Sequence, residues 1–404
     1  MTPKAVTLFI VFVALTLPGC AASTPPAPRS AAVAPPAQES AAKFPSTAAE
    51  RVNVETGSPA TPTGIAVFYG TDRNVTGDQQ PEEYYGGLRG DETPSLGVCN
   101  VTIPPDHRVG EVERPFIASI PVVRRFSPSL EDPNKHVVIQ GIAPLSRDDF
   151  LRQLRPRIAA ARSREAFIFV HGFNTSFAKA CRRTAQLAND LKAFEGIPLM
   201  YSWASVGSPS PRAYTADEGT IDWSVPHFEG FLGMVASETG ATTVHLIAHS
   251  MGSRLVAATL ESLSKKAAVP PQLGQLVFAA ADMDAATFKS RYLPAFKSFP
   301  KRTTADVSAN DEALRLARQV ALYARVGEAG RNILVTEGMD TIDVSPVDTT
   351  LLGHDYLATK AVFRDLFELL RHGTAPHERC GTPTCYLETV TSGNLRYWRL
   401  LKTD

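Results

Sequence analysis

The chain has 404 residues, and 41 lysines and arginines balance 41 aspartates and glutamates, so its formal net charge is zero. A balanced charge gives the chain no electrostatic reason to bind nucleic acid or an anionic membrane surface. Hydrophobic residues make up 44% of the chain and charged residues 20%, which allows a large buried core and excludes a chain that is disordered as a whole. No apolar run reaches the roughly 18 residues that a membrane-spanning helix needs.

Residues 1–19 have the layout of a secretory signal peptide. Lys4 precedes an apolar stretch at residues 5–17, which is too short to span a membrane. The stretch ends in Leu-Pro-Gly-Cys, which resembles the lipobox of bacterial lipoproteins, although Pro18 stands where a small residue is usual. In such proteins the cysteine is acylated and becomes the new N-terminus. We therefore expect Cys20 to carry lipid; the alternative is ordinary secretion with a spare thiol.

Residues 20–62 are predicted to form a disordered stalk between this anchor and a folded body. Of the 30 residues from 21 to 50, 23 are Ala, Pro, Ser or Thr, a composition with almost nothing to bury. We expect contact with a membrane through the anchor only, and no contact with nucleic acid. Ala21 follows the cysteine in place of the aspartate that resembles an inner-membrane retention signal. This favours a bacterial cell envelope location on the periplasmic face of the outer membrane.

From residue 63 onward, short β-branched runs alternate with helical patterns. Strands separated by helices predict an α/β domain with a mainly parallel sheet covered on both faces, and the strand-rich residues 64–145 predict antiparallel strands at its start. We expect this domain at residues 63–371 and a tail with one strand at 372–404. Strands are predicted at 65–69, 98–103, 137–142, 167–170, 198–203, 244–248, 275–280, 303–307, 333–335 and 394–400, and helices at 147–161, 177–194, 228–238, 253–264, 311–323 and 356–371.

Ser250 gives the strongest chemical signal. The buried run at residues 244–248 leads directly into it, a helix follows, and the small residues Ala248 and Gly252 flank it two positions away on each side. This is the nucleophile-elbow pattern G-x-S-x-G with Ala in place of the first Gly, and its turn is too tight for larger flanking side chains. A serine that only caps the helix is the alternative, but the strand–turn–helix context favours a catalytic nucleophile.

A serine hydroxyl needs a neighbouring imidazole to accept its proton, and in this architecture the chain order is serine, acid, histidine. Three histidines follow Ser250. His354 lies in a loop after the last strand and before a helix, whereas His372 and His377 lie beyond the last helix. We therefore expect His354 to be the base.

The acid is expected between the serine and the histidine, after a strand. Asp311 follows the strand at 303–307, the penultimate one, and opens a helix; Asp282 follows the strand at 275–280. Asp311 could also be a plain helix cap. We predict Asp311 as the acid that holds the His354 tautomer while it stays ionised, with Asp282 as the alternative.

His171 and Gly172 follow the buried strand at 167–170. In α/β-hydrolases the loop at this place supplies an N–H to the oxyanion hole. We expect this N–H from Phe173 and the other from Met251, which follows the serine. Gly172 would let the backbone come close to the substrate.

Four cysteines follow the predicted anchor, and an even set in an exported protein suggests disulfides. Cys380 and Cys385 lie five positions apart around a glycine and a proline, so they could close a small loop. With the histidines at 372 and 377 they match no common zinc spacing, so we favour a disulfide over a metal. Cys99 and Cys181 could also pair, which the sequence does not decide. No metal and no cofactor is expected.

Two further features remain open. The segment at 204–226 separates a strand from the next predicted helix, and a long insertion there often forms a lid or pocket wall. Trp203, Tyr214 and Trp223 would give it an aromatic face that binds an acyl or aryl group or packs in the core. The cluster Thr71-Asp72-Arg73 could contact substrate, but a buried ion pair is the favoured interpretation.

In chain order the sequence contains VFYGTDR at 67–73, HGFN at 171–174, YSW at 201–203, AHSMG at 248–252, SANDEAL at 308–314 and GHDY at 353–356. These motifs resemble those of a bacterial α/β-hydrolase family of undefined function that is related to esterases and lipases. The resemblance covers residues 64–371. It implies the α/β-hydrolase fold and the triad Ser250, Asp311 and His354, but little about the substrate.

The sequence thus predicts a membrane-tethered serine hydrolase that cleaves a small-molecule carboxylic ester or thioester through an acyl-enzyme. Two alternatives stay open. One is a binding lipoprotein on a hydrolase fold without turnover, and the other is a serine amidase or peptidase.

Overall fold

The computed structural model describes residues 61–115, 130–191, 194–296, 299–347, 354–379 and 386–402. The predicted signal peptide, Cys20 and the stalk up to residue 60 lie outside the described residues, as do Cys380 and Cys385. Among the described residues, no helix combines the length and the apolar character needed to cross a membrane.

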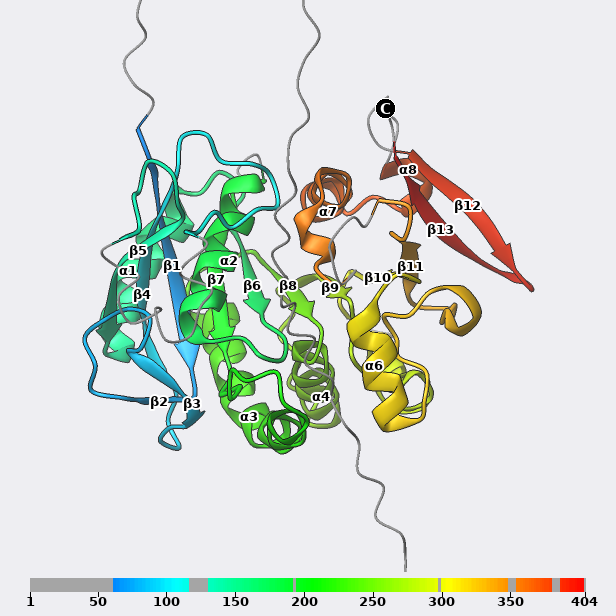
Figure 1. Cartoon of the computed structure of the whole chain (residues 1–404), viewed down its shortest axis with the longest axis horizontal. Coiled ribbons are helices and arrows are strands. Elements are labelled where there is room, and N and C mark those ends of the chain that lie inside the picture. The colour runs from blue at the N-terminus through cyan, green and yellow to red at the C-terminus, as the bar shows by residue number, and fades with distance from the viewer. Residues whose placement is uncertain are drawn as a thin grey trace, which may run out of the picture. The chain divides into compact units, whose positions relative to one another are not determined.

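In the described part of the chain, eleven strands form one sheet in the order β12-β13-β11-β10-β9-β8-β6-β7-β1-β4-β5, and β2 and β3 pair separately. Figure 1 shows the sheet crossing the view from β5 and β4 on the left to β13 and β12 on the right. The strands are β1 (Thr63–Thr71), β2 (Arg73–Val75), β3 (Tyr85–Arg89), β4 (Ser95–Ile103), β5 (Val138–Leu145), β6 (Glu165–Val170), β7 (Ile197–Ser202), β8 (Thr243–His249), β9 (Leu273–Ala279), β10 (Arg302–Val307), β11 (Asp340–Asp343), β12 (Tyr386–Ser392) and β13 (Leu395–Leu401).

The predicted α/β class is confirmed. The central strands from β1 through β7, β6, β8, β9, β10 and β11 to β13 pair in parallel. The antiparallel pairs are β1 with β4 and β4 with β5 at the N-terminal side, and β12 with β13 at the other edge. The carboxyl ends of parallel strands share one edge of the sheet, and this is where ligand chemistry gathers in such folds.

Helices cover both faces of the sheet, and the side chains of β6 are buried against helices on each face. Phe167 and Phe169 pack with side chains of α2 and α7, whereas Ile168 and Val170 pack with side chains of α1, α3 and α4. Successive side chains of a strand point to opposite faces, so a strand buried on both faces is apolar throughout. The helices are α1 (Arg147–Ala160), α2 (Phe177–Asp190), α3 (Pro211–Glu238), α4 (Gly252–Lys265), α5 (Ala285–Thr287), α6 (Glu312–Ala321), α7 (Lys360–His372) and α8 (Pro376–Arg379).

Two predictions about elements were wrong. The segment at 204–226 is not a long insertion, because α3 begins at Pro211. The Ser210 side chain accepts a hydrogen bond from the Ala213 N–H, and proline is favourable at the first helical position because its missing N–H needs no partner there. Residues 333–335 form no strand. The sheet instead uses β11, whose short sequence Asp-Thr-Ile-Asp has a single apolar residue and so no apolar run.

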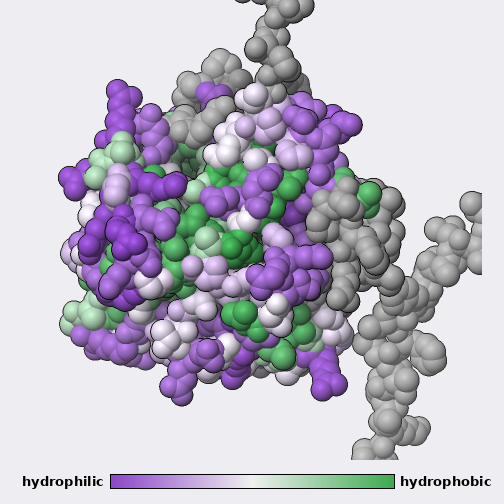
Figure 2. Space-filling view, turned by 90° about the vertical axis from the view of Figure 1, so that its left-hand side faces the viewer, coloured by the Kyte–Doolittle hydropathy of each residue, from purple (hydrophilic) through white to green (hydrophobic). Residues whose placement is uncertain are grey.

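The tail contributes two strands to the sheet, where the sequence predicted one. β12 and β13 form an antiparallel hairpin, and β13 pairs in parallel with β11. At the opposite edge lies β5, most of whose residues are partly or fully exposed. Figure 2 views that side, where hydrophilic side chains lie at the margin and hydrophobic ones gather toward the middle.

A disulfide joins Cys99 on β4 to Cys181 on α2. Both cysteines are buried in the cluster formed by β1, β4 and α2. This bond closes a loop of 82 residues and ties the antiparallel strands to a helix of the parallel part. The pairing that the sequence left open is therefore present.

Candidate active site

Ser250 forms the turn between β8 and α4. Its backbone lies in the left-handed region at φ 51°, which side chains rarely adopt and which marks functional turns. The flanking positions explain the need for small residues. A Cβ on Gly252 would lie 2.3 Å from the His171 carbonyl oxygen, and Ala248 is fully buried. The turn has the geometry expected of a nucleophile elbow.

The structure brings together the serine, histidine and aspartate singled out in the sequence. Ser250 Oγ lies 2.9 Å from His354 Nε2, although the two residues are 104 positions apart. His354 Nδ1 lies 2.8 Å from Asp311 Oδ2 and 3.0 Å from Oδ1. These are hydrogen-bond distances. The three residues follow β8, β11 and β10, so all lie at the carboxyl edge of the sheet.

Asp311 is both a helix cap and the partner of the histidine. Its Oδ1 accepts the Leu314 N–H at 2.8 Å at the start of α6. Its Oδ2 accepts the Tyr356 hydroxyl at 2.6 Å. A carboxylate has about four lone-pair sites, so these bonds leave room for His354. Sequence reasoning did not assign a role to Tyr356; its place two residues after His354 was the available signal.

Asp311 raises the pKa of His354. Burial, the largest single effect, lowers this pKa because it disfavours the charged ring, but the hydrogen bond and negative charge of Asp311, with smaller contributions from Asp282 and Asp355, raise the pKa overall. A raised pKa suits a group that accepts the serine proton and must exist briefly as an imidazolium.

His249, next to the serine, bonds the backbone of His354. Its Nε2 donates a hydrogen bond to the His354 carbonyl oxygen at 3.0 Å, since a carbonyl can only accept. Burial and the nearby charge of His354 lower the pKa of His249 to about 4. His249 is therefore neutral at physiological pH. In the sequence, the only sign of this role of His249 is its position next to Ser250.

Asp282, the alternative acid, has other partners. Its Oδ1 accepts from Arg325 Nε at 2.6 Å, and its Oδ2 accepts from the Tyr214 hydroxyl at 2.7 Å. Arg254 Nη2 lies 3.4 Å from Oδ1. Burial alone would raise the pKa of Asp282, but the two guanidinium charges lower it. The Asp282 peptide N–H bonds the Ser250 carbonyl at 3.2 Å, which ties this ionic network to the elbow.

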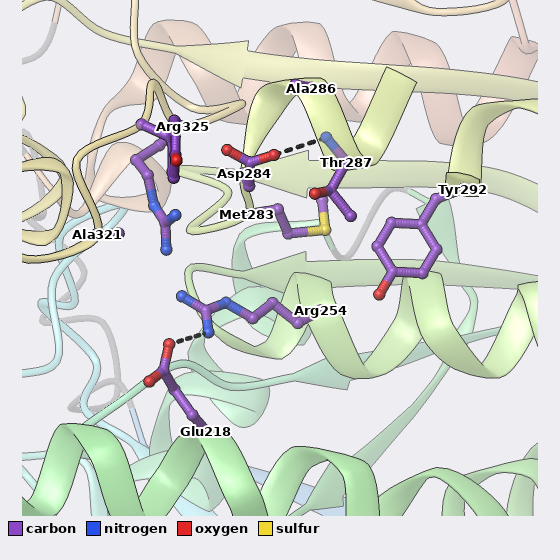
Figure 3. A pocket seen from close by; sticks show the side chains of 10 residues that line it. Glu218, Arg254, Met283, Asp284, Ala286, Thr287, Tyr292, Ala321 and Arg325 are labelled. Carbon is purple, nitrogen blue, oxygen red and sulfur yellow. Dashed lines mark hydrogen bonds and ion pairs between the residues drawn. The ribbon is translucent and has the colours of Figure 1, made fainter. Parts of the chain in front are cut away.

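A cavity of about 570 Å³ opens beside this network. In Figure 3 the guanidinium groups of Arg254 and Arg325 approach each other, and Glu218 of α3 meets Arg254. Arg254 lies four residues after Ser250, about one helical turn along α4, but neither Ser250 nor His354 lines this cavity. Its lining combines Glu218, Arg254, Met283, Asp284, Ala286, Thr287, Tyr292, Ala321, Tyr323 and Arg325. A second cavity, of about 560 Å³, has His171, Gly172, His249 and His354 in its lining.

The loop with the predicted oxyanion donor lies against the serine. A Cβ on Gly172 would lie 2.6 Å from Ser250 Cβ, so this position admits only glycine. Within the described residues, neither the Phe173 nor the Met251 N–H donates a backbone hydrogen bond. The Phe173 ring packs edge-on against Tyr214 with centroids 5.4 Å apart, and the Tyr214 hydroxyl bonds Asp282, so the loop contacts the ionic network around Asp282.

The cluster at 71–73 does not form the predicted ion pair. Arg73 is buried, but its guanidinium donates to neutral groups of β7 and the neighbouring loops, and Asp72 instead accepts from the Tyr201 hydroxyl at 2.9 Å. Among the predicted aromatics, Trp203 is fully buried and donates to the His171 carbonyl at 2.7 Å.

No group of three or more His, Cys, Asp or Glu side chains suited to a metal occurs in the described ranges.

The parallel sheet, the elbow after β8 and the helices on both faces define an α/β hydrolase. The chain belongs to the family of α/β hydrolases of unknown function called DUF900, which matches residues 146–371, more than half of the chain. Among solved structures, it is similar to α/β hydrolase domain-containing protein 10 from mouse at 13% identity and a TM-score of 0.26, over 50% of this chain and 86% of the mouse protein. No curated protein matches the sequence.

Proposed function

We propose that this chain is a serine hydrolase that cleaves a carboxylic ester or thioester of a small molecule through an acyl-enzyme. The observation that carries the proposal is the unbroken chain of hydrogen bonds from Ser250 Oγ through the His354 ring to the Asp311 carboxylate. A serine hydroxyl is a poor nucleophile by itself, and such a chain activates it.

In the first half-reaction, His354 Nε2 takes the serine proton while Ser250 Oγ bonds to the substrate's carbonyl carbon. The carbonyl oxygen becomes negatively charged, and the Phe173 and Met251 N–H groups stabilise it. Asp311, still ionised, stabilises the imidazolium. His354 then gives its proton to the leaving alcohol or thiol, and the acyl group stays on the serine.

In the second half-reaction, water takes the place of the leaving group. His354 removes a proton from this water as the oxygen attacks the acyl carbon. When the second tetrahedral intermediate collapses, the carboxylic acid leaves and Ser250 Oγ recovers its proton from His354. The same ring nitrogen therefore serves as base and acid in both halves.

The cavity beside Arg254 is the proposed site for one arm of the ester. Its lining combines Met283, Ala286 and Tyr292 with charged side chains, and the peptide N–H of Asp282, next to Met283, bonds the Ser250 carbonyl. Ligand sites commonly combine such walls with a few placed polar groups.

Reaction with a fluorophosphonate probe tests the hydrolase directly. The wild type should label, and Ser250→Ala should not. A wild type that stays unlabelled, or a variant that labels equally, would favour the binding-protein alternative. Hydrolysis of short and long p-nitrophenyl esters, compared with matched anilides, then separates an esterase from an amidase.

We further propose that the enzyme is tethered to a bacterial membrane by lipid on Cys20, with the outer membrane favoured. The lipobox-like residues 17–20 and the composition of residues 21–50 support this. Cells grown with radioactive palmitate should label the full chain but not Cys20→Ser, which should also leave the membrane fraction. An unlabelled wild type would contradict the anchor.

A further inference from the structure

Arg73 is a buried cation beside the proposed oxyanion loop. It begins β2, just after the carboxyl end of β1, and is 2% exposed. All five of its N–H donors have acceptors at hydrogen-bond distance, and all these acceptors are uncharged. They are Ser202 Oγ at 2.8 Å from Nε, the Gly86 and Ser205 carbonyls at 3.0 and 2.9 Å from Nη1, and the Thr175 carbonyl and His171 Nε2 at 2.6 and 3.2 Å from Nη2.

Burial of a cation among neutral partners is costly. Burial lowers the pKa of Arg73 to about 10, although the charges of Asp72 and Asp217 act in the opposite direction. The side chain therefore stays cationic at neutral pH. An apolar residue would avoid this cost but would leave the five acceptors around Arg73 without their donor.

The partners of His171 define its tautomer. A guanidinium can only donate, so His171 Nε2 must offer its lone pair to Arg73. A carbonyl can only accept, so Nδ1 must carry the proton that bonds the Gly172 carbonyl at 2.9 Å. The ring is stacked on Trp203, with centroids 5.2 Å apart. Burial and the charge of Arg73 hold the pKa of His171 well below its ordinary value, so it remains neutral.

The Gly172 carbonyl belongs to the same peptide unit as the Phe173 N–H. This peptide bond is trans, since the one cis bond recorded in the described residues lies elsewhere, and in a trans peptide the carbonyl and the N–H point in opposite directions. The bond from His171 therefore determines where the Phe173 N–H points. Gly172 itself lies against Ser250.

We infer that Arg73, acting through His171, is a positioning residue that turns the Gly172–Phe173 peptide so that its N–H faces the oxyanion. This inference rests on the proposed function. The bond from Arg73 Nη2 to Thr175 holds the far end of the same loop. The chain of hydrogen bonds from Arg73 through the His171 ring to the Gly172 carbonyl also polarises the peptide. This polarisation makes the Phe173 N–H a stronger donor.

Kinetics of four variants test the inference. Arg73→Met and His171→Leu should lower kcat by about tenfold or more, up to the ~10²–10³ that loss of one oxyanion donor costs, with KM within about twofold. Their affinity for a boronic-acid transition-state analogue should fall by the same factor as kcat/KM. His171→Asn places its amide N–H where Nδ1–H stood, so it should keep kcat within a few-fold of wild type. Arg73→Lys keeps the charge without the planar fork and should fall in between.

Arg379 provides the matched control. It is also buried, but it pairs with a carboxylate, Asp365 of α7, at 3.1 Å. Arg379→Met should lower the free energy of unfolding and leave kcat and analogue affinity of the folded protein unchanged. If Arg73→Met and His171→Leu behave like this control, or change only KM, the inference is wrong.

A spectroscopic measurement keeps the inference testable if Arg73→Met does not fold. The ring ¹⁵N shifts of His171 in the wild type should show the Nδ1–H tautomer from about pH 5 to pH 9. An Nε2–H tautomer or a charged ring in that range would overturn it. A wild type that resists the fluorophosphonate probe would instead defeat the proposed function, so the two failures can be told apart.

Discussion

Tyr356 donates a hydrogen bond to the Asp311 carboxylate at 2.6 Å, so the residue two positions after the proposed base also holds the proposed acid. The same carboxylate caps α6 through Leu314. A hydrogen bond to a charged acceptor contributes about 1.5–3 kcal/mol. Tyr356→Phe should lower the free energy of unfolding by about this amount and lower kcat, measured by denaturant titration and ester hydrolysis. Tyr85→Phe, which removes a bond to neutral Tyr69, should cost about 1 kcal/mol and leave kcat unchanged.

The two candidate acids should behave differently when neutralised. Asp311→Asn should reduce kcat on the order of 10³–10⁴, as expected when a triad histidine loses its proper tautomer. Asp282→Asn should lower stability, because Arg254 and Arg325 would lose a buried charge partner, but should reduce kcat less than tenfold. Steady-state kinetics and thermal unfolding of both variants check this. The reverse order of kcat losses would make Asp282 the acid.

The raised pKa of His354 sets the pH dependence. Only the neutral ring accepts the serine proton, so kcat/KM should rise with pH, with its midpoint above the ordinary histidine value of about 6.5. The same shift also contributes to the free energy of unfolding. This contribution is fully present below about pH 6.5 and is lost as the pH rises through the raised pKa. A kcat/KM profile from pH 5 to 9 measures the midpoint. Asp311→Asn should move it down; an unchanged midpoint would show that Asp311 does not act on His354.

The cavity predicts a chain-length effect. Ala286→Phe should fill part of it and lower kcat/KM for long-chain p-nitrophenyl esters at least about tenfold, while the acetate stays within about twofold, because only the longer arm needs the space. The control is Ala159→Phe on α1, an exposed position. Equal losses for both esters, or none, would show that the substrate does not use this cavity.

The disulfide predicts a redox-dependent stability. Cross-linking an 82-residue loop stabilises a fold by roughly 4 kcal/mol in the chain-entropy account. Unfolding in a reducing agent should therefore occur at lower denaturant than without it. The Cys99→Ala/Cys181→Ala double variant should show the lower midpoint in both conditions. A wild type with the same midpoint in both would contradict the contribution of this bond.

Much of the fold follows from local patterns. Apolar runs separated by helical segments predicted the parallel sheet, since strands such as β6 must be apolar on both faces to be buried between helices. Local patterns failed where the local chemistry was ambiguous. The segment at 204–226 was predicted as an insertion, yet α3 starts inside it at Pro211. Strand β11 is too short and polar to be recognised.

The sequence by itself determined the kind of site: a serine in an elbow, and a histidine and an acid after later strands, because these depend on residue type and chain order. Only the tertiary structure decided which groups meet. Asp282 and Asp311 both follow strands at one edge of the sheet. Asp311 contacts His354, whereas Asp282 contacts two arginines. Arg73 likewise meets an imidazole and carbonyls instead of a carboxylate. Hydrogen bonds and charges act over a few ångströms in space, and that separation is not written in the order of residues along the chain.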